Sequence, residues 1–265
     1  MPVYERLSMV VGFTLIGLAL YFVIDLPTRL VNFEIFNRAI SIAASQRLLM
    51  VVLLGGLALT GAGAVIRSHD RSTSYTVPFW VNAMFIVVLA TLTLARLGSP
   101  LAWAIGLMLT GVLLWCAIYV EYYLLRGHTR HRTLAQLYSQ WISYALMLAF
   151  GLLLYEARLS PVLNAGLVFF LAWLLSLSIF KLYAAEGTGI GIFGFLTGLG
   201  LAQLTWVLSY WRISATGGGL LTLLIFYLLS GLIVTHLQNK ITRRAVLEYI
   251  LVGGAGLWII VRFAY

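Results

Sequence analysis

Charged residues are scarce in this sequence. Only 9% of its 265 residues are Asp, Glu, Lys or Arg, whereas 62% are hydrophobic. A soluble domain carries about 25% charged and about 50% apolar residues, so this composition is that of a membrane protein. Apolar segments account for almost all of the chain, which leaves no room for a soluble domain. We therefore expect a single integral membrane domain over residues 1–265.

Cysteine and acidic residues are also few. Cys116 is the only cysteine, so the chain forms no intrachain disulfide and no all-cysteine metal site. None of the 8 Asp and Glu residues lies near the centre of an apolar segment. Ion-driven transporters usually keep a carboxylate at that depth, so its absence argues against one. The sequence has no G-x-S-x-G nucleophile motif and no acidic cluster for two metals, and we expect neither metal nor cofactor.

Long apolar segments are abundant. A helix that crosses the hydrocarbon core of a bilayer needs about 20 apolar residues. Nine windows of the sequence approach or exceed this length: Leu7–Ile24, Leu48–Ile66, Val77–Leu94, Leu101–Leu125, Leu137–Tyr155, Val162–Tyr183, Gly189–Tyr210, Leu220–Leu237 and Val246–Ala264. The windows are apolar on every face and lack the alternation of a β-barrel. The pattern predicts an all-α, polytopic transmembrane helical bundle of about nine spans.

The segment Leu26–Arg47 after the first window is too polar to span a membrane. Phe33, Phe36 and Ile40 recur in it at helical spacing, with polar residues such as Glu34 between them. We expect one amphipathic helix lying in the membrane interface here, with a plain connector as the alternative.

Basic residues set the expected orientation. A cytoplasmic N-terminus places ten basic residues on the inner side of the membrane and seven on the outer side. The positive-inside rule then predicts a cytoplasmic N-terminus and an external C-terminus. Arginine outnumbers lysine 15 to 2, which is typical of GC-rich genomes and favours the inner membrane of a bacterium as the location.

The densest basic segment is EYYLLRGHTRHRTLAQ, residues 121–136. Arg126, Arg130 and Arg132 lie within it, between two apolar windows. Such clusters beside a membrane span contact anionic lipid head groups. No basic stretch belongs to a folded module outside the membrane, so we expect membrane lipids as partners and no nucleic acid.

Four ionisable residues near the expected inner rim are weak candidates for catalysis: Glu121, His131, His236 and Glu248. If their helices are neighbours, these groups and the arginines of residues 126–132 form a site for a phosphate head group, with a carboxylate or histidine as proton acceptor. The plainer interpretation is charge that orients the protein. His128 and His131 have H-x-x-H spacing, but the flanking arginines disfavour a metal cation there.

Small residues recur along one face of the seventh window. Gly187, Gly191, Gly194 and Gly198 are separated by three or four residues. Such a ridge lets a second helix approach closely within a membrane. We expect it to pack against another helix, either of this chain or of a partner membrane subunit.

Three functions remain open from the sequence. The first is a non-catalytic subunit or scaffold of a membrane assembly, which packs against partner helices and anionic lipid. The second is a permease for a neutral or lipid-like solute, with Asn164 and Gln203 as the polar residues that line its cavity. The third is an intramembrane enzyme that acts on phospholipid or polyprenyl-phosphate head groups at the cytoplasmic rim.

Overall fold

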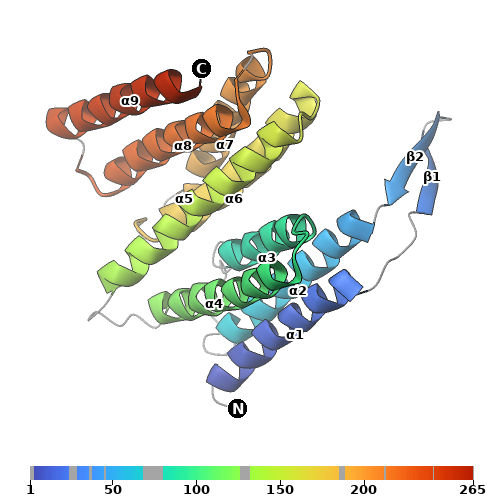
Figure 1. Ribbon diagram of the computed structural model, residues 1–265. Helices are drawn as coiled ribbons and strands as arrows, with labels where there is room; N and C mark the ends of the chain where they lie inside the picture. The colour runs from blue at the N-terminus through green and yellow to red at the C-terminus, as the bar shows by residue number, and fades with distance from the viewer. Residues whose placement is uncertain are drawn as a thin grey trace. The chain divides into compact units, whose positions relative to one another are not determined.

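The chain folds into two compact units, Met1–Arg126 and Gly127–Tyr265, which are described separately (Figure 1). The computed structural model describes residues 3–23, 29–35, 38–44, 46–67, 80–125, 132–184, 189–211, 213–240 and 242–264. Within these residues there are nine α-helices and one short hairpin. The predicted all-α membrane bundle is confirmed, whereas the expectation of a single membrane domain stays a prediction.

The first unit is a bundle of four helices. They are α1 (Val3–Val23), α2 (Gln46–Arg67), α3 (Val81–Leu94) and α4 (Pro100–Leu125). Consecutive helices pack against each other, and α1 also packs against α4, which closes the bundle. Small residues such as Ala58, Ala62 and Ala90 are buried in this unit. Small side chains at helix contacts permit the close approach that drives helix association in lipid.

The segment expected to form an amphipathic helix, residues 26–47, contains an antiparallel hairpin instead. Its strands are β1 (Arg29–Ile35) and β2 (Arg38–Ala44), and their register places Phe33 opposite Ile40. The prediction of a helix was wrong, because the apolar residues of this segment fit both a helical period and the period of 2 of a strand. Its β-branched and aromatic residues favour strand, and the register also places Val31 opposite Ile42.

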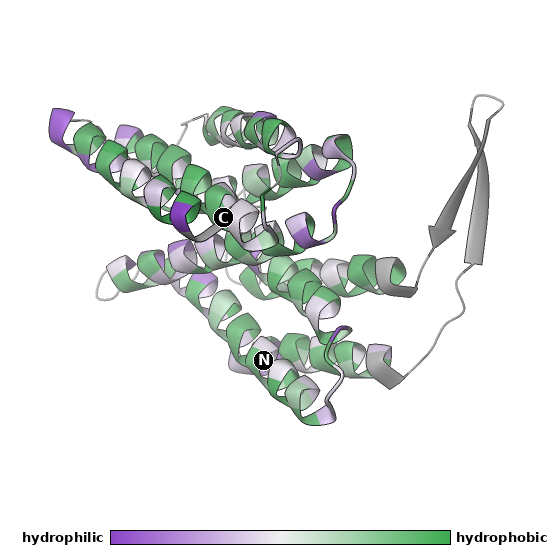
Figure 2. Ribbon diagram, turned by 45° about the horizontal axis from the view of Figure 1, so that its top comes forward, coloured by the Kyte–Doolittle hydropathy of each residue, from purple (hydrophilic) through white to green (hydrophobic). Residues whose placement is uncertain are grey.

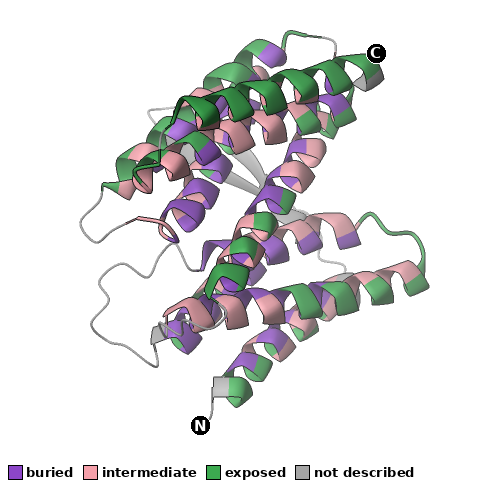
Figure 3. Cartoon of the chain, turned by 90° about the vertical axis from the view of Figure 1, so that its left-hand side faces the viewer, coloured by how far each residue is buried: buried purple, intermediate pink, exposed green. Residues whose placement is uncertain are grey.

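The second unit contains five helices. They are α5 (Arg132–Glu156), α6 (Pro161–Phe180), α7 (Ile190–Leu208), α8 (Ala215–Leu237) and α9 (Arg243–Ala264). The helix α5 packs against α6 and α8, α6 packs against α7, and α9 packs against α8. Most of α9 is exposed (Figure 3), so this helix forms one edge of the unit.

Glycine sets the packing between α5 and α8. A Cβ atom at Gly151 would lie 3.2 Å from the Cα atom of Gly219, so the two backbones are in contact. A Cβ atom at Gly218 would collide with the ring of Tyr155. The two helices therefore touch tightly at these glycines.

Eight of the nine helices are long and apolar enough to cross a membrane. The exception is α3, whose 14 residues span about 21 Å at 1.5 Å per residue, against a hydrocarbon core of about 30 Å. Apolar residues cover the outer as well as the inner faces of the described helices (Figure 2). This distribution suits contact with lipid, and the chain is a multi-pass membrane protein.

Candidate functional site

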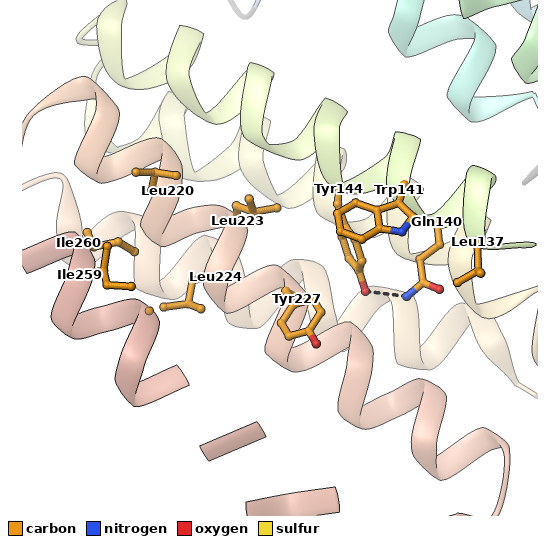
Figure 4. Close-up of a pocket in the computed structure, with 11 residues that line it drawn as sticks. Leu137, Gln140, Trp141, Tyr144, Leu220, Leu223, Leu224, Tyr227, Ile259 and Ile260 are labelled. Atoms are coloured by element: carbon orange, nitrogen blue, oxygen red, sulfur yellow. Dashed lines mark hydrogen bonds between the residues drawn. The ribbon is translucent and has the colours of Figure 1, made fainter. Parts of the chain in front are cut away.

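An open cleft runs between α5, α8 and α9 of the second unit, with a volume of about 460 Å³. Figure 4 shows its lining residues strung along the three helices. The indole of Trp141 stands at the mouth, 70% exposed, whereas the Tyr144 side chain is only 8% exposed at the floor. The cleft thus has depth, and its long axis follows the membrane-spanning helices.

The walls of the cleft are hydrocarbon. Leu220, Leu223 and Leu224 come from α8, and Ile259 and Ile260 come from α9. These residues recur at spacings of one, three or four because they occupy one face of each helix. They make the part of the cleft farthest from Tyr144 an entirely apolar channel.

Hydrogen-bonded polar groups close the other part of the cleft. The Gln140 Nε2 amide donates to the Tyr144 hydroxyl over 3.0 Å, and that hydroxyl lies 3.2 Å from the Ser230 Oγ atom. The Tyr183 hydroxyl donates to Gln140 Oε1 over 2.8 Å. We call Gln140, Tyr144, Tyr183 and Ser230 the polar cluster. It joins α5, α8 and the turn that follows α6.

The Tyr183 hydroxyl stays protonated at neutral pH. Burial, and to a smaller extent the neighbouring Tyr144, raises the pKa of the Tyr183 hydroxyl above its ordinary value of 10.0. Tyr183 therefore remains a hydrogen-bond donor to Gln140, and the Gln140 amide is held in one orientation. A fixed amide presents fixed polar atoms to whatever enters the cleft.

Tyrosines attach α9 to the edge of the cleft. The rings of Tyr144 and Tyr227 pack edge to face with centroids 5.6 Å apart, and the Tyr227 and Tyr249 centroids are 6.0 Å apart. The Tyr249 hydroxyl lies 3.3 Å from Thr235 Oγ1, and its ring fills the space left by the missing side chain of Gly231. These contacts fix the start of α9 on α8.

Few polar groups line the cleft. Among the described residues, its lining has three polar groups besides the indole, namely the Gln140 amide and the hydroxyls of Tyr144 and Tyr227, and it has no acidic, basic or histidine side chain. A cleft of this size with few polar groups has the character of a small-molecule site. It offers no nucleophile paired with a base.

The four residues predicted as weak catalytic candidates have different surroundings. Glu121 in α4 of the first unit is 2% exposed and accepts a hydrogen bond of 3.3 Å from Asn82 Nδ2 of α3. His236 and Glu248 in the second unit are both exposed. The His236 ring packs against the Phe193 ring, with centroids 5.8 Å apart. His131 lies outside the described residues.

Of the three arginines predicted to contact lipid, the structure describes one. Arg132 is exposed and begins α5, whereas Arg126 and Arg130 lie outside the described residues. No group of three or more His, Cys, Asp or Glu residues gathers in a way that holds a metal ion within the described part of the chain.

The glycine ridge of α7 is used inside the second unit. A Cβ atom at Gly194 would meet Leu177 and Trp173 of α6, and one at Gly198 would lie 2.8 Å from the carbonyl oxygen of Phe169. Gly191 is open, with nothing within 4 Å, and Gly187 lies outside the described residues. The covered part of the ridge therefore packs against a helix of the same chain.

The two predicted cavity residues have different positions. Asn164 in α6 is buried and lines a second cavity, near the start of that helix. Gln203 is exposed on α7 and is not among the residues that line this cavity.

Sequence reasoning did not identify the polar cluster. A signal for it exists in α5, where Gln136, Gln140 and Tyr144 follow one another at intervals of four residues. That spacing puts them on one helix face, and the Gln136 Nε2 amide indeed donates to the Leu182 carbonyl over 2.9 Å.

Comparison with known proteins places the chain in a family. Residues 26–264 match the family described as "Protein of unknown function (DUF5656)", which covers most of the chain, so the chain belongs to this family. No curated protein and no solved structure matches it.

Proposed function

We propose that this member of the DUF5656 family is a non-catalytic membrane protein that binds the hydrocarbon chain of a membrane lipid in the cleft between α5, α8 and α9. One observation carries the proposal. The cleft is an apolar channel between membrane-spanning helices, and it ends at hydrogen-bonded polar groups. This arrangement complements a long apolar chain that ends in, or carries, a polar atom.

The dimensions of the cleft favour a chain over a helix. A partner helix is about 10 Å across and rises 5.4 Å per turn, so two turns require roughly 850 Å³. The cleft offers about 460 Å³. A single acyl or isoprenoid chain is narrower, and the apolar walls around Leu223 and Ile260 exclude a ligand that is polar along its length.

The polar cluster determines how far a ligand extends along the cleft. The Tyr144 and Tyr227 rings line the cleft and pack edge to face on each other. A carbonyl or hydroxyl group of a lipid at this point gains hydrogen bonds from Gln140 or a tyrosine, which a saturated chain end does not. We therefore expect lipids with a polar atom beside the chain to be retained in preference to plain alkanes.

Lipid retention tests this function. Leu223→Trp adds an indole to the wall of the cleft, whereas Leu232→Trp adds the same group to an exposed position of the same helix outside it. Native mass spectrometry after purification in mild detergent should find bound lipid on the wild type and on Leu232→Trp, with at least about a tenfold lower occupancy on Leu223→Trp. Equal occupancy in all three proteins would contradict the proposal.

The basic residues of the sequence indicate where the protein lies in the cell and which way it faces. We propose the plasma membrane of a bacterium, with a cytoplasmic N-terminus and an external C-terminus, because of the distribution of basic residues. Arg126, Arg130 and Arg132 are proposed to contact anionic lipid head groups at the cytoplasmic face. An assembly with further membrane subunits would use exposed helix faces such as that of α9, because Gly194 and Gly198 of α7 already pack against α6.

A further inference from the structure

A second cavity, of about 560 Å³, lies at one end of the second unit. The connections between α5 and α6 and between α7 and α8 meet there. Polar residues line much of it, including Arg158, Asn164, Ser209 and Ser214. No residue that lines this cavity also lines the cleft between α5, α8 and α9, so the two are separate sites.

Asn164 is the first indication of a ligand. Its side chain is 4% exposed and lines the cavity, yet its Oδ1 atom has no hydrogen-bond partner within the protein. A buried oxygen without a donor is destabilising and is rare in native structures. A ligand that supplies a hydroxyl or amine hydrogen would satisfy it once the Asn164 amide rotates to bring this buried atom to the cavity.

Positive potential is the second indication. Among the described residues that line the cavity, Arg158 is the one charged side chain, and none of them is acidic. The helix α6 begins beside it at Pro161, and the Ser160 side chain does not cap the helix. The start of α8 at Ser214 also lines the cavity, although the Ser214 Oγ atom there already accepts a hydrogen bond from the Gly217 N–H over 3.1 Å. Helix N-termini carry partial positive charge and free N–H groups, and both favour an anion.

The backbone at Arg158 adds a further constraint. Its φ angle is 45°, in the left-handed region that glycine occupies most easily. The residue ends α5 in the position where helices often carry glycine. Glycine would adopt this backbone conformation more easily than arginine does. Arg158→Gly therefore removes the guanidinium group without straining the backbone.

We propose that this cavity binds a phosphate ester that carries a free hydroxyl group. Arg158 and the N-terminus of α6 hold the phosphate oxygens, and the hydroxyl donates to the unpaired Asn164 Oδ1. The exposed indole of Trp211, at the edge of the cavity, covers the carbon skeleton between the two groups. A soluble glycerol phosphate and the head group of phosphatidylglycerol share this chemistry.

Two arms of one binding experiment distinguish these sources. In the first, sn-glycerol 3-phosphate and inorganic phosphate are titrated against the delipidated protein in detergent. In the second, the protein is reconstituted in nanodiscs of phosphatidylcholine with or without phosphatidylglycerol, and the lipid that remains bound after re-extraction is quantified. Saturable binding of glycerol phosphate or selective retention of phosphatidylglycerol supports the site, and the arm that responds identifies the source.

The variants test the two groups separately. Asn164→Leu and Arg158→Gly should each weaken binding by about tenfold or more, whereas Arg243→Ala, at an exposed position outside the cavity, should leave it unchanged. Asn164→Leu should also raise the melting temperature, because it removes a buried unpaired oxygen, so a loss of binding there is not a loss of folding. Leu223→Trp, which blocks the separate cleft, should not affect this site.

Several results would overturn the inference. They are the absence of saturable binding in both arms, binding that Arg158→Gly and Asn164→Leu leave unchanged, and inorganic phosphate binding as tightly as glycerol phosphate. The last result would remove the role of Asn164. A protein that binds glycerol phosphate normally but retains no lipid in the cleft would refute the proposed function and leave this site standing.

Discussion

Tyr144 connects the hydrogen-bonded floor of the cleft to the packing of the second unit. Its hydroxyl interacts with Gln140 on its own helix and with Ser230 of α8. Its ring packs edge to face on Phe226, with centroids 5.8 Å apart. One side chain therefore both orients the polar cluster and joins two helices.

Tyr144→Phe separates these two roles. The ring contacts remain, but Gln140 loses a hydrogen-bond acceptor, while Ser230 keeps its bond to the Phe226 carbonyl. We expect the variant to lose about 1 kcal/mol of stability, or about 2–4 °C in melting temperature. Thermal unfolding in detergent measures this shift. The control Tyr210→Phe changes an exposed tyrosine and should unfold like the wild type, and equal midpoints for both variants would show that the polar cluster contributes nothing to stability.

Glu121 shows how far a single residue can be read from the sequence. It lies one turn before the end of a span, and this position along the chain predicts a place at the membrane rim. Its burial against Asn82 depends on how α3 packs on α4. That packing arises from side-chain shapes along both helices, which a sequence pattern does not specify.

At the scale of elements, the contact between α6 and α7 depends on glycine. A Cβ atom at Gly198 would press on the backbone of Phe169, which cannot rotate away as a side chain can. Gly198→Ala should therefore cost about 1–3 kcal/mol through overpacking. On the same face, Gly191→Ala meets open space and should cause no loss. Thermal unfolding of the two variants checks the difference, and similar midpoints would mean that α7 does not pack against α6 in this way.

Most helices could be predicted from the sequence, because a helix in a membrane satisfies its own backbone hydrogen bonds and needs a long apolar segment. The nine windows correspond to nine helices in the described residues. The hairpin was not predicted, because Phe33 and Ile40 are seven residues apart, which fits two turns of a helix, whereas in the hairpin they lie opposite each other on two strands.

Less of the candidate site could be predicted from the sequence. The cleft joins α5 to α8 and α9, which lie far along the chain, so its existence depends on which helices become neighbours. Asn164 and Gln203 were expected to line one cavity of a permease. Asn164 lines the cavity near the start of α6 and Gln203 does not, so the permease cavity stays a prediction. Ionisable residues attract attention in a membrane sequence, whereas the polar cluster consists of uncharged tyrosine, glutamine and serine.

For the whole molecule, the membrane topology depends on α3. Nine crossings place the termini on opposite sides of the membrane, and eight place them on the same side. We expect a cytoplasmic N-terminus and an external C-terminus, with local thinning of the bilayer around the 14 residues of α3. In a Cys116→Ala background, a cysteine introduced at the C-terminus should react with an impermeant maleimide on intact cells. One at the N-terminus should react only after permeabilisation, and equal reactivity of the two ends would exclude nine crossings.

The most direct test of the lipid-binding cleft is a cryo-electron microscopy map of the protein in nanodiscs whose lipids carry brominated acyl chains. We predict elongated density between α5, α8 and α9, with strong bromine density beside Leu223 and Ile260 and its end at Gln140 and Tyr144. A cleft that is closed by repacked side chains, or filled by a helix of another protein or another copy, would contradict the account.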